Sequence, residues 1–146
     1  MYERILISTD GSEVAQKGVE HGLALARAIG ARATIVMVVE SLLPYVGADG
    51  GLSASAYLEY ANAQKTMAEK VLDEARLAAD GKGVEVDTAC LENILPAEAI
   101  IETARARNCG LIVMSSHGRR GLRRLILGSV TSEVLANSPI PVLVVR

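Results

Sequence analysis

The sequence predicts an α/β fold in which one doubly wound sheet of five parallel strands carries helices on both faces. Two observations indicate this fold. Short apolar runs rich in β-branched residues recur along the chain, as is typical of parallel strands that are buried on both faces. Segments with apolar residues at helical spacing separate these runs, and each crossover between them is expected to be right-handed. The 146 residues show no internal repeat, and we expect a single domain spanning residues 1–146.

Five segments are expected to form the strands. Residues 4–9 (RILIST), 32–39 (RATIVMVV) and 111–115 (LIVMS) are apolar runs too short for a helix. The segment VEVDTACL at 84–91 alternates between apolar and polar residues, which indicates a half-exposed edge strand. The chain ends with the apolar strand VLVV at 142–145, after the break SPIP.

Four helices are expected between these strands. The apolar positions of the first helix recur at helical spacing after Ser12, which is a favourable N-cap. A Gly- and Ser-rich loop at 41–55 leads to a long second helix, which stops at DGKG (80–83). Pro96 fits the first turn of a third helix that runs to about residue 108, and the last helix is expected at about 129–137.

Composition and charge exclude several classes of function. Half of the residues are hydrophobic, and the formal net charge of −2 gives no overall attraction to nucleic acid or to an anionic membrane. No apolar run approaches the roughly 20 residues that span a bilayer, and MYERILISTDG does not resemble a signal peptide. Cys90 and Cys109 lack a CxxC motif, as expected of reduced thiols. We therefore expect a cytoplasmic protein with neither a nucleic-acid nor a membrane partner.

Two loops are expected to meet at one edge of the sheet. Ligands of doubly wound sheets bind beyond the carboxyl ends of the strands, where the winding reverses. STDGS follows the first strand, and SSHGRRG follows the fourth. Gly118 lets backbone N–H groups turn toward a ligand, and Gly128 and Ser129 open a helix whose free N–H groups and dipole favour an anion. The sequence therefore predicts an anion site between these loops.

Three known designs are excluded by their motifs. No GxxxxGK[ST] occurs, so the chain has no P-loop, and no GxGxxG follows the first strand, as a dinucleotide-dependent dehydrogenase requires. MSSHG lacks the first glycine of the GxSxG elbow, and no histidine follows His117 to complete a hydrolase triad. We therefore assign no catalytic residue.

Several charged side chains near these loops have two interpretations. Asp10 directly precedes the first helix, so it could cap that helix or contact a ligand. His117 is either an exposed loop residue or a ligand contact, and Glu40 ends the second strand, where dinucleotide folds hold a ribose. Arg119 is the arginine best placed to reach a phosphate. The three arginines between 120 and 124 are expected to be solvated or paired with acidic side chains.

The chain resembles the universal stress protein family over essentially its whole length. The resemblance is carried by ILISTDGS at the start, by VMSSHGRRGLRRLILGSVTSEVLANSPIPVLVV at the end, and by the order of the elements between them. It implies the strand order 3-2-1-4-5 of the Rossmann-like, adenine-nucleotide α-hydrolase-like fold. It also implies a cytoplasmic, regulatory stress-response protein that binds ATP, AMP or another adenine nucleotide, with catalysis limited at most to slow ATP hydrolysis.

The resemblance also implies a set of site residues. The family's nucleotide motif G-x2-G-x9-G-[ST] falls on Ser115, Gly118, Gly128 and Ser129, and only Ser115 departs from it, adding a Cβ and a hydroxyl where the family has glycine. Adenine is implied against Val38, and Asp10 near the base or near phosphates bridged by Mg²⁺, without a metal site of the protein's own. The remaining residues implied at the cleft are Ser8, Thr9, Met114, His117, Arg119, Val130 and Thr131.

The last strand implies a partner of the same sequence. An apolar strand at the edge of a sheet invites pairing, and in this family it pairs with its copy across a twofold axis. We therefore expect a homodimer formed through Val142, Leu143, Val144 and Val145.

Two other functions stay open at this point. One is a family member that has lost nucleotide binding and acts through protein contacts, with Ser115 as its mark. The other is an ATP-pyrophosphatase of the related fold, although STDGS differs from the SGGxDS-like loop of those enzymes. If the protein binds nucleotides, replacing Ser115 by glycine is expected to leave the affinity equal or to improve it.

Overall fold

The five strands form one parallel sheet in the order β3-β2-β1-β4-β5, which confirms the predicted fold class and strand order. The structure is a computed structural model, and it describes residues 1–47, 49–118 and 127–146. The strands are β1 (Arg4–Thr9), β2 (Arg32–Glu40), β3 (Val86–Asn93), β4 (Leu111–Ser115) and β5 (Val142–Val145). The winding reverses between β1 and β4, because the chain crosses from β3 at one edge to β4 on the far side of β1.

The predicted strand boundaries hold within one or two residues, and the largest difference is at β3. This strand was expected to begin at Val84, but the N–H of Val84 donates to the carbonyl of Ala79 and so belongs to the exit of the preceding helix. At its other end β3 extends to Asn93, which pairs with Glu40 of β2. Both shifts move β3 toward the carboxyl edge of the sheet.

In the residues that the structure describes, four helices and one short 3₁₀ turn connect the strands. The helices are α1 (Glu13–Ile29), α2 (Ala54–Lys82), α3 (Pro96–Ala106) and α4 (Ser129–Asn137), and the 3₁₀ turn is η1 (Leu43–Tyr45). Ser12 is the N-cap of α1, as predicted, because its hydroxyl accepts a hydrogen bond from the N–H of Ala15. Gly83 ends α2 at φ 68°, in the left-handed conformation that glycine adopts without strain.

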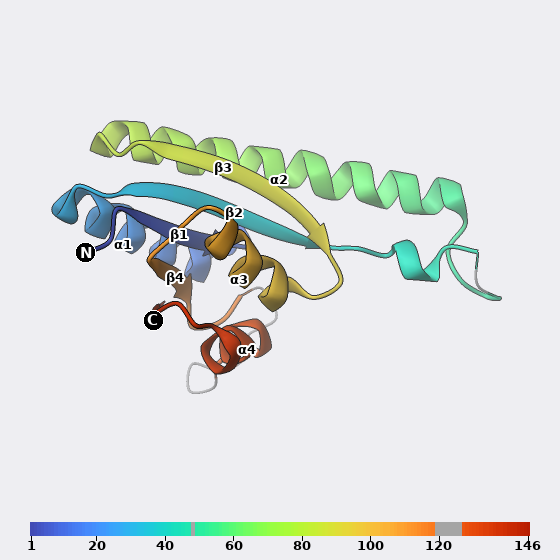
Figure 1. Cartoon of the computed structure of the whole chain (residues 1–146). Coiled ribbons are helices and arrows are strands. Elements are labelled where there is room, and N and C mark those ends of the chain that lie inside the picture. The colour runs from blue at the N-terminus through green and yellow to red at the C-terminus, as the bar shows by residue number, and fades with distance from the viewer. Residues whose placement is uncertain (48, 119–126) are drawn as a thin grey trace.

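Two core clusters lie on opposite faces of the sheet, which explains why the central strands are apolar throughout. On one face α1 and α2 pack against Ile5, Ile7 and Ile35, which are fully buried. On the other face α3 and α4 cover Leu6 and Ile112. Figure 1 shows this arrangement, with α2 running along β2 and β3.

The first half of α2 lies outside this core. Its buried residues begin only at Ala68, and Figure 1 shows the start of the helix reaching past the carboxyl ends of β2 and β3. The helix therefore overhangs the edge of the sheet at which ligands of doubly wound folds bind. No helix in the described part of the chain is long and apolar enough to cross a membrane.

Candidate functional site

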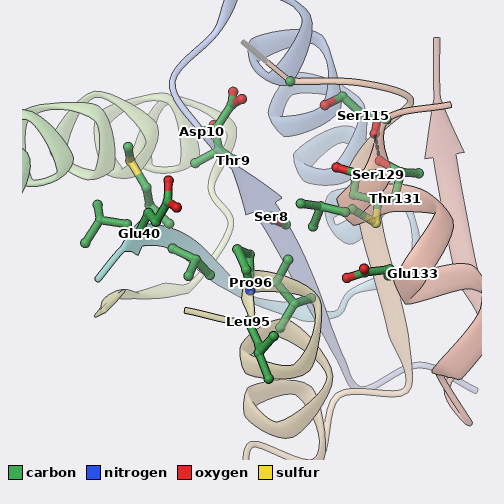
Figure 2. A pocket seen from close by; sticks show the side chains of 18 of the residues that line it. Ser8, Thr9, Asp10, Glu40, Leu95, Pro96, Ser115, Ser129, Thr131 and Glu133 are labelled. Carbon is green, nitrogen blue, oxygen red and sulfur yellow. Dashed lines mark hydrogen bonds between the residues drawn. The ribbon is translucent and has the colours of Figure 1, made fainter. Parts of the chain in front are cut away.

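A cavity of about 560 Å³ opens at the carboxyl edge of the sheet, at the point where the winding reverses. Its volume lies within the range of small-molecule sites, which is about 300–1,000 Å³. β1, β2 and β4 end in it, and helices α2, α3 and α4 contribute its sides (Figure 2).

The structure brings the sequence-predicted residues together at this cavity. Twelve of the thirteen lie in its lining, and Arg119 falls outside the described residues. The twelve are Ser8, Thr9, Asp10, Val38, Met114, Ser115, His117, Gly118, Gly128, Ser129, Val130 and Thr131. Glu40, for which the sequence left a ribose contact open, lines the cavity as well.

Two hydrogen bonds fasten the exit of β4 to the start of α4. The N–H of Gly128 donates to the carbonyl of Ser116 at 2.8 Å, while the N–H of Ser116 donates to the carbonyl of Val145 in the neighbouring β5 at 2.8 Å. The buried hydroxyl of Thr131 donates to the carbonyl of Ser115 at 2.9 Å (Figure 2). These bonds set the two halves of the predicted motif side by side, although nine residues of sequence separate Gly118 from Gly128.

The start of α4 offers backbone donors to the cavity. Gly128 is the N-cap, and since glycine has no side chain, no side-chain oxygen caps the first turn. The first N–H groups of a helix have no partner within the helix, and together with the helix dipole they favour an anion. Ser129 and Val130, the first two helical residues, line the cavity, so this end of α4 can hold a phosphate or a carboxylate group.

Gly118 is needed for space rather than for an unusual backbone conformation. Its φ lies outside the left-handed region, so the turn itself does not require glycine. A Cβ at this position would instead overlap the Oδ2 atom of Asp10. The other carboxylate oxygen of Asp10, Oδ1, accepts a hydrogen bond from the N–H of Ser12 at 2.9 Å. Asp10 therefore supports the turn that leads into α1, where Ser12 is the N-cap, and it also lines the cavity.

Ser115 places its extra atoms beside α1. A Cβ added to Gly18 of α1 would lie 3.7 Å from the Cβ of Ser115, so the serine side chain sits next to that glycine. Its hydroxyl donates to the carbonyl of His117 at 2.9 Å. His117 itself lines the cavity, and its Nδ1 lies 3.0 Å from the hydroxyl of Ser116.

Sequence reasoning missed the walls of the cavity that come from α2 and from the β3–α3 connection. Tyr60, Gln64 and Met67 lie on one face of α2, at the spacing of successive turns, and line the cavity. That spacing was visible in the sequence, but nothing in it revealed that α2 overhangs the sheet. The other lining residues that were missed are Met37, Val39, Ile94, Leu95, Pro96, Ile100 and Glu133. Figure 2 shows Glu133 of α4 in the same wall as Ser129, opposite Leu95 and Pro96.

A hydrogen-bonded cluster stands next to the cavity, where β2 and β3 end. The hydroxyls of Ser41 and Tyr57 both donate to Oε1 of Glu92 at 2.7 Å. These bonds, first that of Ser41 and then that of Tyr57, lower the pKa of the Glu92 carboxyl. The pKa of Tyr57 is raised, chiefly because the carboxylate of Glu92 holds its proton. The cluster ties the start of α2 to β3, beside the lining residues Glu40 and Tyr60.

The chemistry offered by the described residues is that of binding a small anion with an apolar group attached. Gly118, Gly128 and Ser129 bring backbone donors to the cavity. Its lining also includes aliphatic side chains such as Val38 and Ile100, together with the carboxylates of Asp10, Glu40 and Glu133. Within residues 1–47, 49–118 and 127–146, no group of three or more His, Cys, Asp or Glu side chains could hold a metal ion.

Comparison with solved structures agrees with the fold. UspA of Lactobacillus plantarum superposes with a TM-score of 0.86 at 24% identity, covering 99% of this chain and 98% of that one. A universal stress protein solved in complex with cAMP has a TM-score of 0.72 at 22% identity, covering 99% and 97%. One from Archaeoglobus fulgidus, solved in complex with dAMP, has a TM-score of 0.67 at 20% identity, covering 99% and 98%. At these identities the likeness shows the fold.

Comparison of sequences identifies the family as well as the fold. A universal stress protein of Thermus aquaticus is 35% identical over 146 residues, and the match covers 100% of both chains. One from Methanocaldococcus jannaschii is 34% identical over 148 residues, covering 100% of this chain and 83% of that protein. The family model of the universal stress proteins matches residues 1–146. The chain therefore belongs to the universal stress protein family.

Proposed function

We propose that this protein binds an adenine nucleotide in the cavity at the carboxyl edge of its sheet and acts as a regulatory module rather than as an enzyme. The observation that carries the proposal is that Gly118 and the N-terminus of α4 line the same cavity as aliphatic side chains such as Val38 and Ile100. Phosphates fit the backbone donors, and a flat, weakly polar base fits the aliphatic side chains. Relatives solved with cAMP and dAMP support the same ligand class.

The ligand is positioned by different parts of the lining. The N–H groups at Gly118, Ser129 and Val130 bind the phosphates, with Arg119 as a further phosphate contact. The base lies against Val38, and Asp10 contacts the ribose or a Mg²⁺ ion carried by the phosphates. Among the candidates ATP offers the most acceptors to these donors, and charge-assisted bonds of this kind contribute about 1.5–3 kcal/mol each. Three or four of them are enough for micromolar affinity after the entropy lost on binding.

The direct experiment is to denature the purified protein and to identify any released nucleotide by mass spectrometry. The stripped protein is then titrated calorimetrically with ATP, AMP and cAMP, each with and without Mg²⁺. Micromolar binding of at least one of them is expected. The absence of both a released nucleotide and any affinity better than about millimolar would refute the proposal. That result would favour the alternative of a family member that works through protein contacts.

We further propose that the protein is a cytoplasmic homodimer joined through β5. This strand lies at the edge of the sheet and consists of Val142, Leu143, Val144 and Val145, all of them only partly buried. Pairing with the same strand of a second copy satisfies the free edge and covers these side chains. Leu143 and Val145 pack on one core cluster and Val142 on the other, which leaves Val144 as the position to test. Val144→Lys should convert a dimer into a monomer in analytical ultracentrifugation, and a dimer that survives this change refutes the β5 interface.

A further inference from the structure

The hydroxyl of Ser115 is engaged with the loop that follows β4. It donates to the carbonyl of His117 at 2.9 Å, and the residue is 7% exposed. The carbonyl of Ser115 is itself fixed, because it accepts the hydrogen bond from Thr131 of α4. Ser115 thus joins three elements at one point: the end of β4, the loop after it and the first turn of α4.

The geometry of the peptide bond turns this contact into a constraint on Gly118. The described chain contains no cis peptide, so the carbonyl of His117 and the N–H of Gly118 point in opposite directions from one rigid plane. The hydrogen bond from the serine hydroxyl holds this carbonyl toward Ser115. The N–H of Gly118 is thereby directed away from that hydroxyl, in a residue that lines the cavity.

We propose that Ser115 is a positioning residue: its hydroxyl fixes the His117–Gly118 peptide plane and thereby aims the Gly118 N–H at the phosphate of the bound nucleotide. The inference rests on the proposed function and deepens it. It reverses the expectation drawn from the sequence, in which Ser115 was an obstacle that glycine would relieve. Replacing it by glycine removes the hydroxyl that sets this plane, so the affinity should fall.

The structure provides a matched control in the adjacent residue. Ser116 is also buried, at 5% exposure, and its hydroxyl also contacts His117, but at the imidazole Nδ1 instead of the backbone carbonyl. Ser116 does not belong to the lining of the cavity. Ser115→Ala and Ser116→Ala therefore delete the same group from neighbouring buried positions, and only the first releases the peptide plane of Gly118.

The experiment measures the affinity of the stripped wild type and of Ser115→Ala, Ser115→Gly, Ser115→Thr and Ser116→Ala for AMP and for adenosine. One hydrogen bond is worth about two- to twelvefold in affinity, so Ser115→Ala and Ser115→Gly should bind AMP more weakly by about that factor. Their affinity for adenosine, which has no phosphate, should stay within about twofold of the wild type. Ser115→Thr keeps the hydroxyl and should restore AMP binding, whereas Ser116→Ala should behave as the wild type.

The results distinguish nucleotide binding by the protein from the positioning role of Ser115. If the wild type binds neither AMP nor ATP, the proposed function fails and this inference fails with it. If the wild type binds AMP and Ser115→Ala binds it equally well, only the positioning role is refuted. An equal loss for AMP and adenosine in Ser115→Ala would also refute it, because a general loss of packing weakens both ligands alike.

Discussion

The contact between Gly118 and Asp10 gives the most exact prediction about the site. A methyl group at position 118 would overlap Oδ2 of Asp10, and this aspartate is held by the hydrogen bond from Ser12 to Oδ1 at 2.9 Å. In Gly118→Ala the carboxylate has to rotate away or the loop has to move. Rotation breaks a hydrogen bond to a charged acceptor, worth about 1.5–3 kcal/mol at most. Because Asp10 is partly exposed, water replaces some of this, and we expect a loss of about 1–2 kcal/mol in the free energy of unfolding.

The effect on binding should be larger than the effect on folding. If the loop moves, the Gly118 N–H leaves its place at the cavity, and one charge-assisted bond to a phosphate is lost. This corresponds to roughly a 10- to 100-fold weaker affinity for AMP or ATP. Urea denaturation measures the first quantity, and calorimetric titration measures the second.

A double-mutant cycle with Asp10→Ala tests the cause. Once the carboxylate is gone, the methyl group of Gly118→Ala has space, so the second change should cost less than half of what it costs in the wild type. The coupling free energy between the two positions is then at least about 0.5 kcal/mol, and its sign shows that the double variant is better than the sum of the single ones. Strictly additive effects would show that the overlap with Asp10 is not the reason for the glycine.

Three further predictions concern the rest of the molecule. Gly22→Ala should lower the free energy of unfolding by about 1–3 kcal/mol, because the new Cβ would lie 2.8 Å from a buried isoleucine of β1. Gly81→Ala should raise the free energy of unfolding by about 0.5–1 kcal/mol, because a Cβ at this helical position has nothing within 4 Å. Urea denaturation that ranks the two variants the other way would contradict this packing. The residue Cys90 is exposed and Cys109 is buried, so mass spectrometry should find iodoacetamide on Cys90 first. Desolvation of the Cys90 sulfur by its neighbours raises the pKa of this thiol, so its labelling should speed up as the pH rises above neutral. Faster labelling of Cys109 than of Cys90 would refute this assignment. The lowered pKa of Glu92 means that its ionised form stabilises the fold above the ordinary glutamate range, and that this contribution is lost as the pH falls through the lowered value. The difference in melting temperature between the wild type and Glu92→Gln should therefore shrink between about pH 7 and about pH 3, and a constant difference would contradict the role of the two hydroxyls.

The sequence was sufficient for the fold because the pattern that predicts it is local. Apolar runs such as 4–9 and 111–115 lie in strands buried on both faces, and the spacing after Ser12 marks the buried side of α1. The boundary of β3 was wrong because the exit of the preceding helix decides where the strand can begin. Val84 has the β-branched side chain of a strand residue, but its N–H completes the last turn of α2 instead.

Some residues of the candidate site could be predicted from local sequence, and others depend on how the elements are arranged in space. Residues on the loops after β1 and β4 could be predicted, because each follows directly from a recognisable strand and the topology places both loops at one edge. Tyr60, Gln64 and Met67 could not, because their place in the lining depends on how far α2 projects beyond β2 and β3. That projection is set by the length of the helix and by where its packing begins, at Ala68, and neither is encoded near the residues that reach the cavity.

The nucleotide motif treats its three glycine positions as equivalent, but in the structure positions 115, 118 and 128 are subject to different physical constraints. At 118 a Cβ would overlap a carboxylate oxygen of Asp10, and at 128 it would lie 3.2 Å from the Cα of His117, a tight contact that requires a small shift of the neighbouring backbone. At 115 the Cβ lies beside α1, 3.7 Å from the place that a Cβ of Gly18 would take, which is ordinary van der Waals contact. A departure from the motif is informative only together with the contacts that its side chain makes, and here the Ser115 hydroxyl reaches the carbonyl of His117 in the loop.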